Sequence, residues 1–397
     1  MTGFAYKVKS NRFSCAGIKF QYHPLPQNDE LLSSWLVRTA FVHLTDPATF
    51  INLYLPEWKN IFWMSDIDVS ADENLLQTLA YKSRFSHELL YSLTLKSYEG
   101  CLSEHITGKT RNPFVQSLGR YCRIKVNHGL RFCPLCLKED EHPYFRKKWR
   151  LSFSTACLKH KCFLKDRCAE CGSAVNPYRT MRERDLGIAY CYNCGADLRR
   201  ERVEMIAEGS YGLWAIKRIY EILETGAYIF RGGYVYSFLF FDVLRFFVRA
   251  VYYWGKTRGL LDHEVMSQAI DFRAQRLRNN LIENIPLKEQ YLLFSGLVRL
   301  FEGYPGRMLS FCGANRLRGS DLTRDMKYIP FWYRRIVDSF DMGMYSVSLE
   351  EVKNVIRYLK KKSIIINKTN VARMMGVCRD FKERGDIQGL IFNAKSG

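Results

Sequence analysis

Four pairs of metal-binding side chains, each pair separated by two residues, lie between positions 133 and 194. They are Cys133 and Cys136 in CPLC, Cys157 and His160 in CLKH, Cys168 and Cys171 in CAEC, and Cys191 and Cys194 in CYNC. A gap of two residues lets both ligands of one turn approach an ion from the same side, and two such turns complete a tetrahedron around zinc. The spacing therefore predicts two zinc ions with four protein ligands each.

Sites of this kind are structural. A catalytic zinc keeps one position open for water or substrate, whereas four protein ligands close the site. Cys162 is a surplus ligand: pairing it with Cys157 would leave a gap of four residues and discard His160. We therefore expect His160 to bind and Cys162 to stay outside. The spacing leaves open whether successive pairs share an ion, which needs shorter loops, or whether the pairs are interleaved.

Motifs of several enzyme classes are incomplete. Both GKT sequences, which start at Gly108 and Gly255, lack the glycine that a phosphate-binding loop carries five positions earlier. The signature of zinc deaminases, a His-x-Glu followed by Pro-Cys-x-x-Cys, is also missing. Asp66 and Asp68 are the candidate carboxylates for a metal-dependent nuclease, but a capped loop is the simpler explanation for them. We expect no enzymatic activity.

The composition indicates a folded protein with a basic surface. Apolar residues make up 47% of the 397 residues, and the formal net charge is +20. A chain of this length buries at least one core and divides into two or three domains. The positive charge favours a polyanionic partner, and nucleic acid comes first.

Two features bear on localisation. The N-terminus lacks an apolar stretch followed by a small-residue cleavage site, so we expect a cytoplasmic protein with reduced cysteines. The stretch YSFLFFDVLRFFVRAVYYWG, which starts at Tyr236, carries Asp242, Arg245 and Arg249 on one helical face. It is therefore expected to be a core helix without a membrane partner, because its uninterrupted apolar length is too short to span a bilayer.

The elements that must position the metal ligands are expected to be mainly α-helical. DELLSSWLVRTAFVHL has helical periodicity, with Asn28 or Asp29 as its N-cap, and two later segments each begin with a serine that can cap a helix. We predict three domains: a helical N-terminal domain over 1–126, a tandem zinc-ribbon or zinc-finger module over 127–203, and a helical C-terminal domain over 204–397.

Residues 350–385 show a pattern typical of a helix-turn-helix. Ala372 admits a second helix closely, and Gly376, four positions later, permits a tight turn. Beyond the turn, the apolar Phe381 comes one position early, so a plain three-helix unit is the alternative. The residues that we predict to contact DNA are Lys360, Lys361, Lys362, Arg379, Lys382 and Arg384.

Several motifs resemble the TniQ family of transposition target-selection proteins. HPLPQNDELLSSWLVRTA, from His23, resembles the opening motif of that family, and YLPEWKNIFWMSDID resembles the segment that follows. RFCPLCLKED, CLKHKCFL, CAEC and CYNC resemble its paired zinc module in the same order. The likeness covers about residues 20–200. Beyond 204, FWYRRIVDSF and the helix-turn-helix pattern resemble TnsD-type members more weakly.

The resemblance implies an adaptor that is not an enzyme. Members of this family recognise a target, by binding DNA or by docking on a CRISPR effector complex, and recruit an AAA+ ATPase that brings the transposase. The resemblance therefore implies these partners, a CRISPR-associated transposon as one setting, and the four ligand pairs above as zinc ligands. A zinc-ribbon, helix-turn-helix transcription regulator that binds its operator as a homodimer is the alternative. The sequence does not give the target or the oligomeric state.

Overall fold

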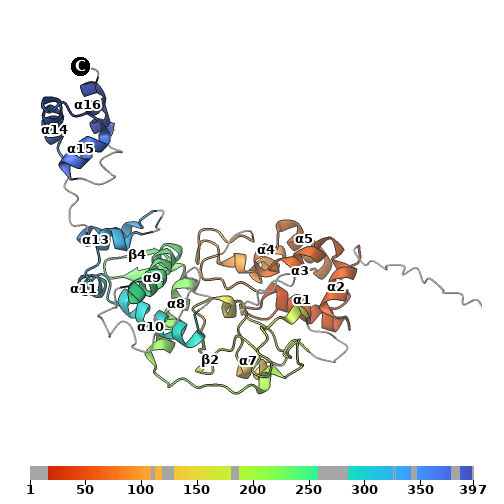
Figure 1. Cartoon of the computed structure of the whole chain (residues 1–397). Helices are drawn as coiled ribbons and strands as arrows, with labels where there is room; N and C mark the ends of the chain where they lie inside the picture. The colour runs from red at the N-terminus through yellow and green to blue at the C-terminus, as the bar shows by residue number, and fades with distance from the viewer. Residues whose placement is uncertain are drawn as a thin grey trace, which may run out of the picture. The chain divides into compact units, whose positions relative to one another are not determined.

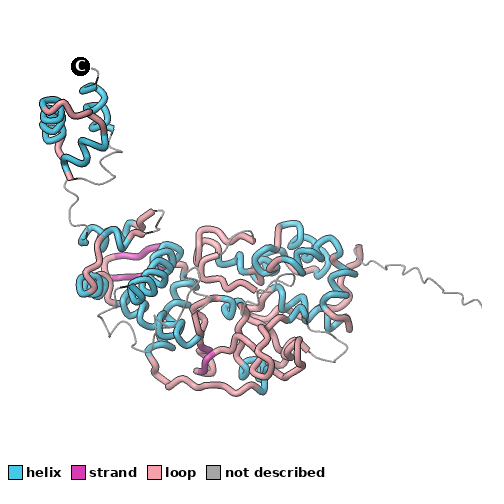
Figure 2. Tube along the Cα trace, viewed as in Figure 1, coloured by secondary structure: helices cyan, strands magenta, loops and turns pink. Residues whose placement is uncertain are grey.

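The computed structural model describes residues 17–108, 112–118, 129–179, 187–257, 285–324, 326, 328–340, 347–376 and 385–395. Helices dominate these residues, and the named strands form two short antiparallel hairpins (Figures 1 and 2). The predicted mainly α fold is confirmed. The chain divides into two compact units, the first comprising Met1–Leu317 and Asp325–Ile336, the second Arg318–Arg324 and Val337–Gly397. The described elements of the first unit come from all three predicted domains.

Short helices form the N-terminal part of the first unit. Side-chain caps explain where several begin, since Asp46, Asp72 and Ser86 each accept a hydrogen bond from the backbone N–H three residues later. The elements are α1 (Leu32–Val42), α2 (Pro47–Tyr54), η1 (Pro56–Trp58), α3 (Lys59–Met64), α4 (Ile67–Ser70), α5 (Glu73–Ser83), α6 (His87–Ser92) and η2 (Leu95–Tyr98). The cap predicted for the first helix is wrong: α1 follows Leu31, and its first turn has no side-chain cap.

The opening motif has a structural role in this layer. Trp35 is fully buried, and its indole N–H donates to the carbonyl of Pro24 at 2.9 Å. The guanidinium of Arg38 lies 2.6 Å from the carboxylate of Glu30, and both side chains are buried. Because a buried charge is costly unless it is paired, the two residues stabilise each other at this position.

The cysteine-rich segment consists mostly of loops (Figure 2). Its elements are α7 (Pro134–Glu139), η3 (Lys147–Arg150), the hairpin β1 (Ala156–Cys157) and β2 (Cys162–Phe163), η4 (Pro177–Arg179) and η6 (Leu198–Arg200). The segment is hydrogen-bonded to the N-terminal helices, since the N–H of Leu31 donates to the carbonyl of Phe145 at 2.9 Å and the N–H of Phe145 donates to Ser34 Oγ at 3.0 Å.

The rest of the first unit is a helical layer around an aromatic core. It contains α8 (Tyr211–Thr225), the hairpin β3 (Ala227–Phe230) and β4 (Gly233–Tyr236), α9 (Ser237–Thr257), α10 (Leu287–Glu302) and α11 (Gly306–Ala314). Phe153 of the cysteine-rich segment stacks on Phe241 of α9 at 5.8 Å and meets Phe294 of α10 edge-on at 6.1 Å. Among the described residues, no helix has both the length and the apolar character needed to cross a membrane.

The second unit has its own small core. Its helices are α12 (Gly319–Leu322), α14 (Leu349–Lys361), α15 (Lys368–Met375) and α16 (Gly385–Lys395), while α13 (Phe331–Phe340) runs across the boundary between the units. Val352, Ile356 and Leu359 of α14 pack with Val371 of α15 and Ile391 of α16. Ser348 caps α14 in a reciprocal arrangement with Glu351, which explains the first residue of this helix.

Candidate metal centres

The first candidate centre joins α7 to the β1–β2 hairpin. Cys133 precedes α7 and Cys136 lies in its first turn, whereas Cys157 ends β1 and His160 lies in the turn that follows. The four ligand atoms all lie within 4.8 Å of one another. Antiparallel pairing of the two strands keeps this turn tight, which holds Cys157 and His160 against the two cysteines of α7.

The distances in this centre match a zinc tetrahedron. Cys136 Sγ lies 3.6 Å from Cys157 Sγ, and His160 Nδ1 lies between 3.3 and 3.6 Å from the three sulfur atoms. Zinc bonds of about 2.3 Å to sulfur and about 2.0 Å to nitrogen place neighbouring ligand atoms about 3.5–3.8 Å apart at tetrahedral angles. The residues present therefore fit a zinc ion without a large rearrangement.

Glu139 extends this centre beyond its four ligands. Its carboxylate lies 2.9 Å from His160 Nε2 and 2.7 Å from the ammonium group of Lys159. Lys159 first, and His160 second, lower the pKa of Glu139, so the carboxylate is ionised at neutral pH. An ionised carboxylate beside Nε2 favours the imidazole tautomer with its proton on Nε2, which leaves Nδ1 free for a metal.

Cys162 is close to this centre but outside the group of four. Its sulfur lies 3.7 Å from Cys133 Sγ, and its side chain is fully buried. It begins β2 directly opposite Cys157 in the strand register. The sulfur of Cys162 therefore lies near only one ligand atom of this centre, Cys133 Sγ, whereas His160 Nδ1 lies near three sulfur atoms.

The second candidate centre is formed by the two remaining pairs. Cys168 Sγ lies 3.7 Å from Cys194 Sγ, and Cys171 Sγ lies 3.6 Å from Cys191 Sγ. The ligand atoms of all four again lie within 4.8 Å of one another. Four thiolates at these distances suit zinc, so successive pairs come together in both centres and the interleaved alternative does not occur in this structure.

The two turns of the second centre have the same backbone geometry. Gly172 follows one pair with φ of 70°, Gly195 follows the other with φ of 78°, and each N–H donates to the carbonyl of the first cysteine of its pair at 2.9 Å. A residue with a side chain rarely adopts this conformation, so glycine permits each turn to close around the ion.

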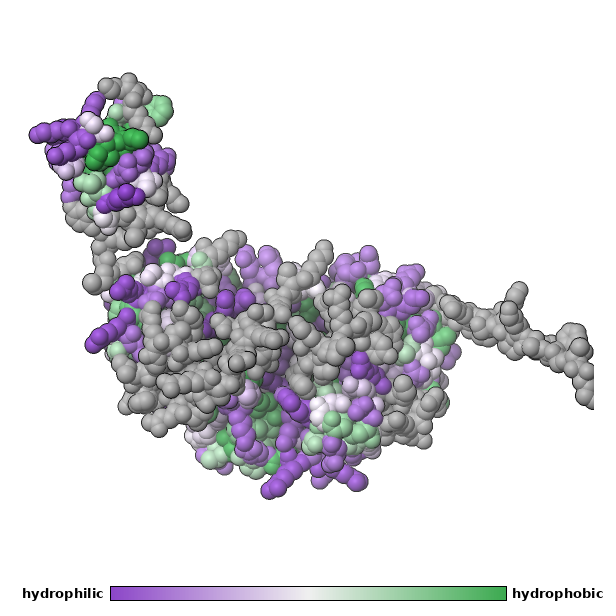
Figure 3. All heavy atoms as spheres, viewed as in Figure 1, coloured by the Kyte–Doolittle hydropathy of each residue, from purple (hydrophilic) through white to green (hydrophobic). Residues whose placement is uncertain are grey.

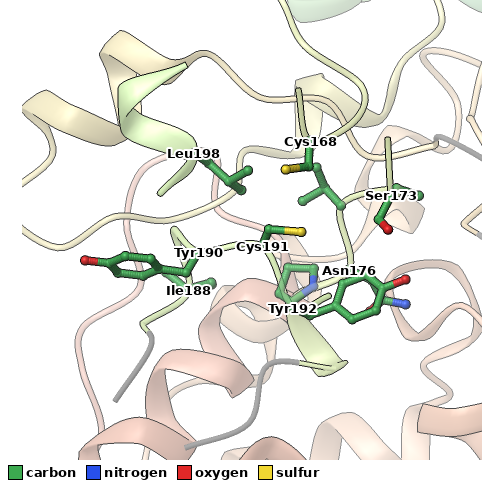
Figure 4. A pocket seen from close by; sticks show the side chains of 11 residues that line it. Cys168, Ser173, Asn176, Ile188, Tyr190, Cys191, Tyr192 and Leu198 are labelled. Carbon is green, nitrogen blue, oxygen red and sulfur yellow. The ribbon is translucent and has the colours of Figure 1, made fainter. Parts of the chain in front are cut away.

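One side of the second centre is buried and the other is exposed. Cys168 and Cys191 are buried, whereas Cys171 and Cys194 are exposed. Figure 4 shows Cys168 and Cys191 coming from separate chain segments beside Leu198. These residues line a cavity of about 10 Å³, which is about the space of one water molecule. Solvent therefore reaches this centre more readily than the first one, whose three cysteines are all buried.

Asp66 and Asp68 do not form an open carboxylate pair. The fully buried guanidinium of Arg150 contacts both, at 3.1 Å from Asp68, and Asp68 also accepts a hydrogen bond from the N–H of Ser33 at 2.8 Å. Burial, together with the nearby charge of Asp66, raises the pKa of Asp68 to about 7 despite Arg150. This cluster connects α4 to the cysteine-rich segment and offers no free oxygen pair for a catalytic cation.

The predicted DNA contacts are described only in part. Lys360 and Lys361 end α14, Lys362 follows it, and all three are exposed. Ala372 is buried and Gly376 ends α15 with φ of 67°, as the helix-turn-helix pattern requires at these two positions. The remaining predicted contacts, Arg379, Lys382 and Arg384, lie outside the described residues.

Two residues beside the first metal centre, Glu139 and Arg131, were not predicted from the sequence. Glu139 lies three residues after Cys136 on a short helix, so the two residues share one helical face. This spacing was the only sign in the sequence that Glu139 lies near the metal centre. Arg131 is fully buried, and its guanidinium donates to the carbonyls of Ser152 and Ser154 and to Gln290 of α10. Nothing in the local sequence separates this arginine from the many others in the chain.

The comparison with known proteins identifies one part of the chain. Residues 21–164 match the model of the TniQ family. No curated protein matches the chain. The matched segment includes the N-terminal helices and the whole of the first metal centre, and it ends four residues before the first cysteine of the second centre.

Proposed function

The chain carries a TniQ-family domain in residues 21–164, and from this premise we propose that it is a target-selection adaptor for DNA transposition. The family implies a role in the selection of transposition targets. In this proposal the protein has no catalytic activity, acts in the cytoplasm, and links a target to an AAA+ ATPase through separate surfaces held by two zinc ions.

The position of the first metal centre carries the proposal. This centre lies inside the family domain and is connected on one side to α1 and on the other to α10. On the first side, the N–H of Leu31, the residue before α1, donates to the carbonyl of Phe145. On the second side, the guanidinium of Arg131, two residues before Cys133, donates to the side-chain oxygen of Gln290 of α10 at 2.5 Å. A closed metal site between two helical layers fixes their relative positions, which suits an adaptor better than an enzyme.

The second unit supplies a surface that suits DNA. The exposed side of α14 carries Lys353, Arg357, Lys360 and Lys361, while the opposite side packs in the core. Figure 3 shows hydrophilic side chains beside a smaller apolar area on the second unit. Basic side chains at successive turns of one helix match the regular spacing of phosphates along a duplex.

Two binding measurements test the proposal. We expect the zinc-loaded chain to bind duplex DNA with an affinity that falls as salt increases, and to bind an AAA+ transposition ATPase. Absence of ATPase binding would favour the transcription regulator instead, which needs only an operator. Weak DNA binding with retained ATPase binding would favour docking on a CRISPR effector complex.

The proposal also excludes nuclease activity. We expect purified protein to leave duplex DNA intact in magnesium, because Asp66 and Asp68 are engaged by Arg150. Magnesium-dependent cleavage that disappears in Asp68→Asn would overturn this part of the proposal.

A further inference from the structure

Two of three consecutive isoleucines in the second unit face solvent in the turn between α14 and α15. Ile365 is 74% exposed and Ile364 is 43% exposed, whereas Ile366 packs against the core of this unit. Ile364 and Ile365 together form the apolar turn. Turns favour glycine, proline, asparagine, aspartate and serine, so the need for a turn does not explain two isoleucines at these positions.

Hydrogen bonds hold the backbone of the apolar turn on both sides. The N–H of Ile364 donates to the carbonyl of Leu359 at 2.9 Å, which closes the end of α14. The side-chain amide of Asn370 in α15 donates to the carbonyl of Ile365 at 2.8 Å. The turn therefore presents its two side chains on a fixed backbone, and little conformational entropy is lost when a ligand binds.

The surroundings of the apolar turn are strongly basic. Between Val352 and Gly376 the sequence has no acidic residue. The same stretch carries seven exposed cationic side chains, which are Lys353, Arg357, Lys360, Lys361, Lys362, Lys368 and Arg373. The acids of α14, Glu350 and Glu351, lie at the other end of that helix. This charge is complementary to a polyanion, and lysines flank the apolar turn on both sides in the sequence.

An apolar contact within a phosphate-binding surface restricts the chemistry of the ligand. Phosphate groups are charged and hydrated, so lysines bind them and isoleucines do not. The apolar group on the base edges of duplex DNA is the C5 methyl of thymine, which lies in the major groove. An isoleucine side chain can bury such a methyl group but cannot form a hydrogen bond with any base.

We propose that the apolar turn enters the major groove of duplex DNA and contacts thymine methyl groups, while Lys362 and Lys368 contact phosphates at the edges of the groove. Ile365, the more exposed isoleucine, makes the principal contact. The proposal rests on DNA binding by the second unit, which belongs to the proposed function. It adds a base contact, and with it a preference for thymine, to the phosphate contacts of the lysines.

Removal of the methyl group from the DNA tests the contact directly. Two fluorescent duplexes share one A·T-rich sequence, but the second carries uracil in place of thymine, which removes the C5 methyl and keeps base pairing. We expect the zinc-loaded full chain to bind the thymine duplex about threefold to fourfold tighter in fluorescence polarisation, which is the effect of burying one methyl group. Equal binding of the two duplexes would overturn the inference.

Serine variants locate the contact on the chain. Ile365→Ser removes the apolar side chain, and Ile229→Ser makes the same change on β3 of the first unit, where the isoleucine is 66% exposed. We expect Ile365→Ser to bind the two duplexes equally, with an affinity for the uracil duplex within about twofold of wild type, because every lysine remains. Ile229→Ser and Ile365→Val should keep the thymine preference. A preference that is retained in Ile365→Ser, or lost equally in Ile229→Ser, would contradict the assignment.

A lipid surface is the competing occupant, because an anionic membrane also combines negative charge with apolar matter. Cosedimentation with vesicles of phosphatidylserine and phosphatidylcholine tests it. We expect the wild-type chain and Ile365→Ser to sediment equally with these vesicles. Sedimentation that is lost in Ile365→Ser, together with equal binding of the thymine and uracil duplexes by wild type, would assign the turn to a lipid surface and overturn the inference.

The duplex and ATPase measurements separate this inference from the proposed function. If the chain prefers the thymine duplex but does not bind the ATPase, the adaptor is wrong and the base contact stands. If it binds the ATPase and both duplexes equally, the adaptor stands and the base contact is wrong. If Ile365→Ser loses ATPase binding and keeps the thymine preference, the turn is a protein contact, against the inference.

Discussion

His160 presents its two ring nitrogens to different partners: Nδ1 lies 3.3 Å from Cys136 Sγ, and Nε2 lies 2.9 Å from the carboxylate of Glu139. Carboxylates behind metal-binding histidines orient the ring, and their removal typically weakens metal affinity about 10–100-fold. We predict that Glu139→Ala lowers the zinc affinity of the first centre by about tenfold, as measured by competition with a chelating dye.

The matched control for this prediction is Lys159→Ala. Lys159 contacts the same carboxylate but is not a metal ligand, and it is well exposed. It should leave zinc affinity within about twofold, because an exposed ion pair contributes little. Equal losses in the two variants would show that Glu139 acts through general charge and not through the orientation of His160.

Metal content tests the ligand assignment. We predict two zinc ions per chain, two in Cys162→Ser, and one in Cys136→Ser, because Cys162 lies near only one ligand whereas Cys136 Sγ lies near two. Mass spectrometry of the native protein, or elemental analysis, measures these numbers. Loss of an ion in Cys162→Ser would mean that this cysteine, and not His160, is the fourth ligand.

The two centres should differ in how fast they release metal. Cys171 and Cys194 are exposed, whereas the three cysteines of the first centre are buried. A chelator removes zinc by replacing the protein ligands, and it can do so only where solvent reaches the ion. We therefore predict that zinc is released in two phases, with the second centre as the fast phase. Cys194→Ser should remove the fast phase and Cys136→Ser the slow one; the reverse assignment would contradict the prediction.

Local spacing explains why the metal ligands could be grouped from the sequence. Each pair lies in one turn, and Gly172 and Gly195 occupy the backbone positions that such turns require. The nitrogen that His160 uses depends on Glu139, which is contributed by another element. It therefore could not be predicted from the spacing of CLKH.

Pairing over long distances explains where the sequence analysis was wrong. Asn28 or Asp29 was expected to cap the first helix, but the carbonyl of Asp29 accepts the N–H of Lys147 and the N–H of Leu31 donates to the carbonyl of Phe145. These contacts hold Asn28 and Asp29 in a turn and Leu31 in an extended conformation, so α1 begins after Leu31. The contact between Arg150 and Asp68 likewise joins residues 82 positions apart, which periodicity within one segment cannot reveal.

The buried cluster around Arg150 should contribute strongly to stability. Arg150→Met would leave the carboxylates of Asp66 and Asp68 without their shared partner, and breaking a buried ion pair on one side costs about 3–5 kcal/mol. We predict a decrease of this size in the free energy of unfolding, measured by urea denaturation of the zinc-loaded chain. Arg200→Met, at a position whose side chain is 88% exposed, should change it by less than about 0.5 kcal/mol.

The basic side of α14 should determine the salt dependence of DNA binding. Lys360, Lys361 and Lys362 are exposed at the end of this helix, and each lysine that neutralises a phosphate adds about 0.9 to the slope of log affinity against log salt. We predict that replacing all three with alanine reduces the magnitude of the slope by about two to three.

The matched control for α14 replaces Lys138, Lys217 and Lys288, three exposed lysines of the first unit, with alanine. It removes the same total charge, so it separates a local phosphate contact from the effect of net charge on association. We expect the control to keep the slope of the wild-type chain in an electrophoretic mobility shift assay. If both triple variants reduce the slope equally, α14 is not the DNA-binding surface, and the second unit would have to serve another partner.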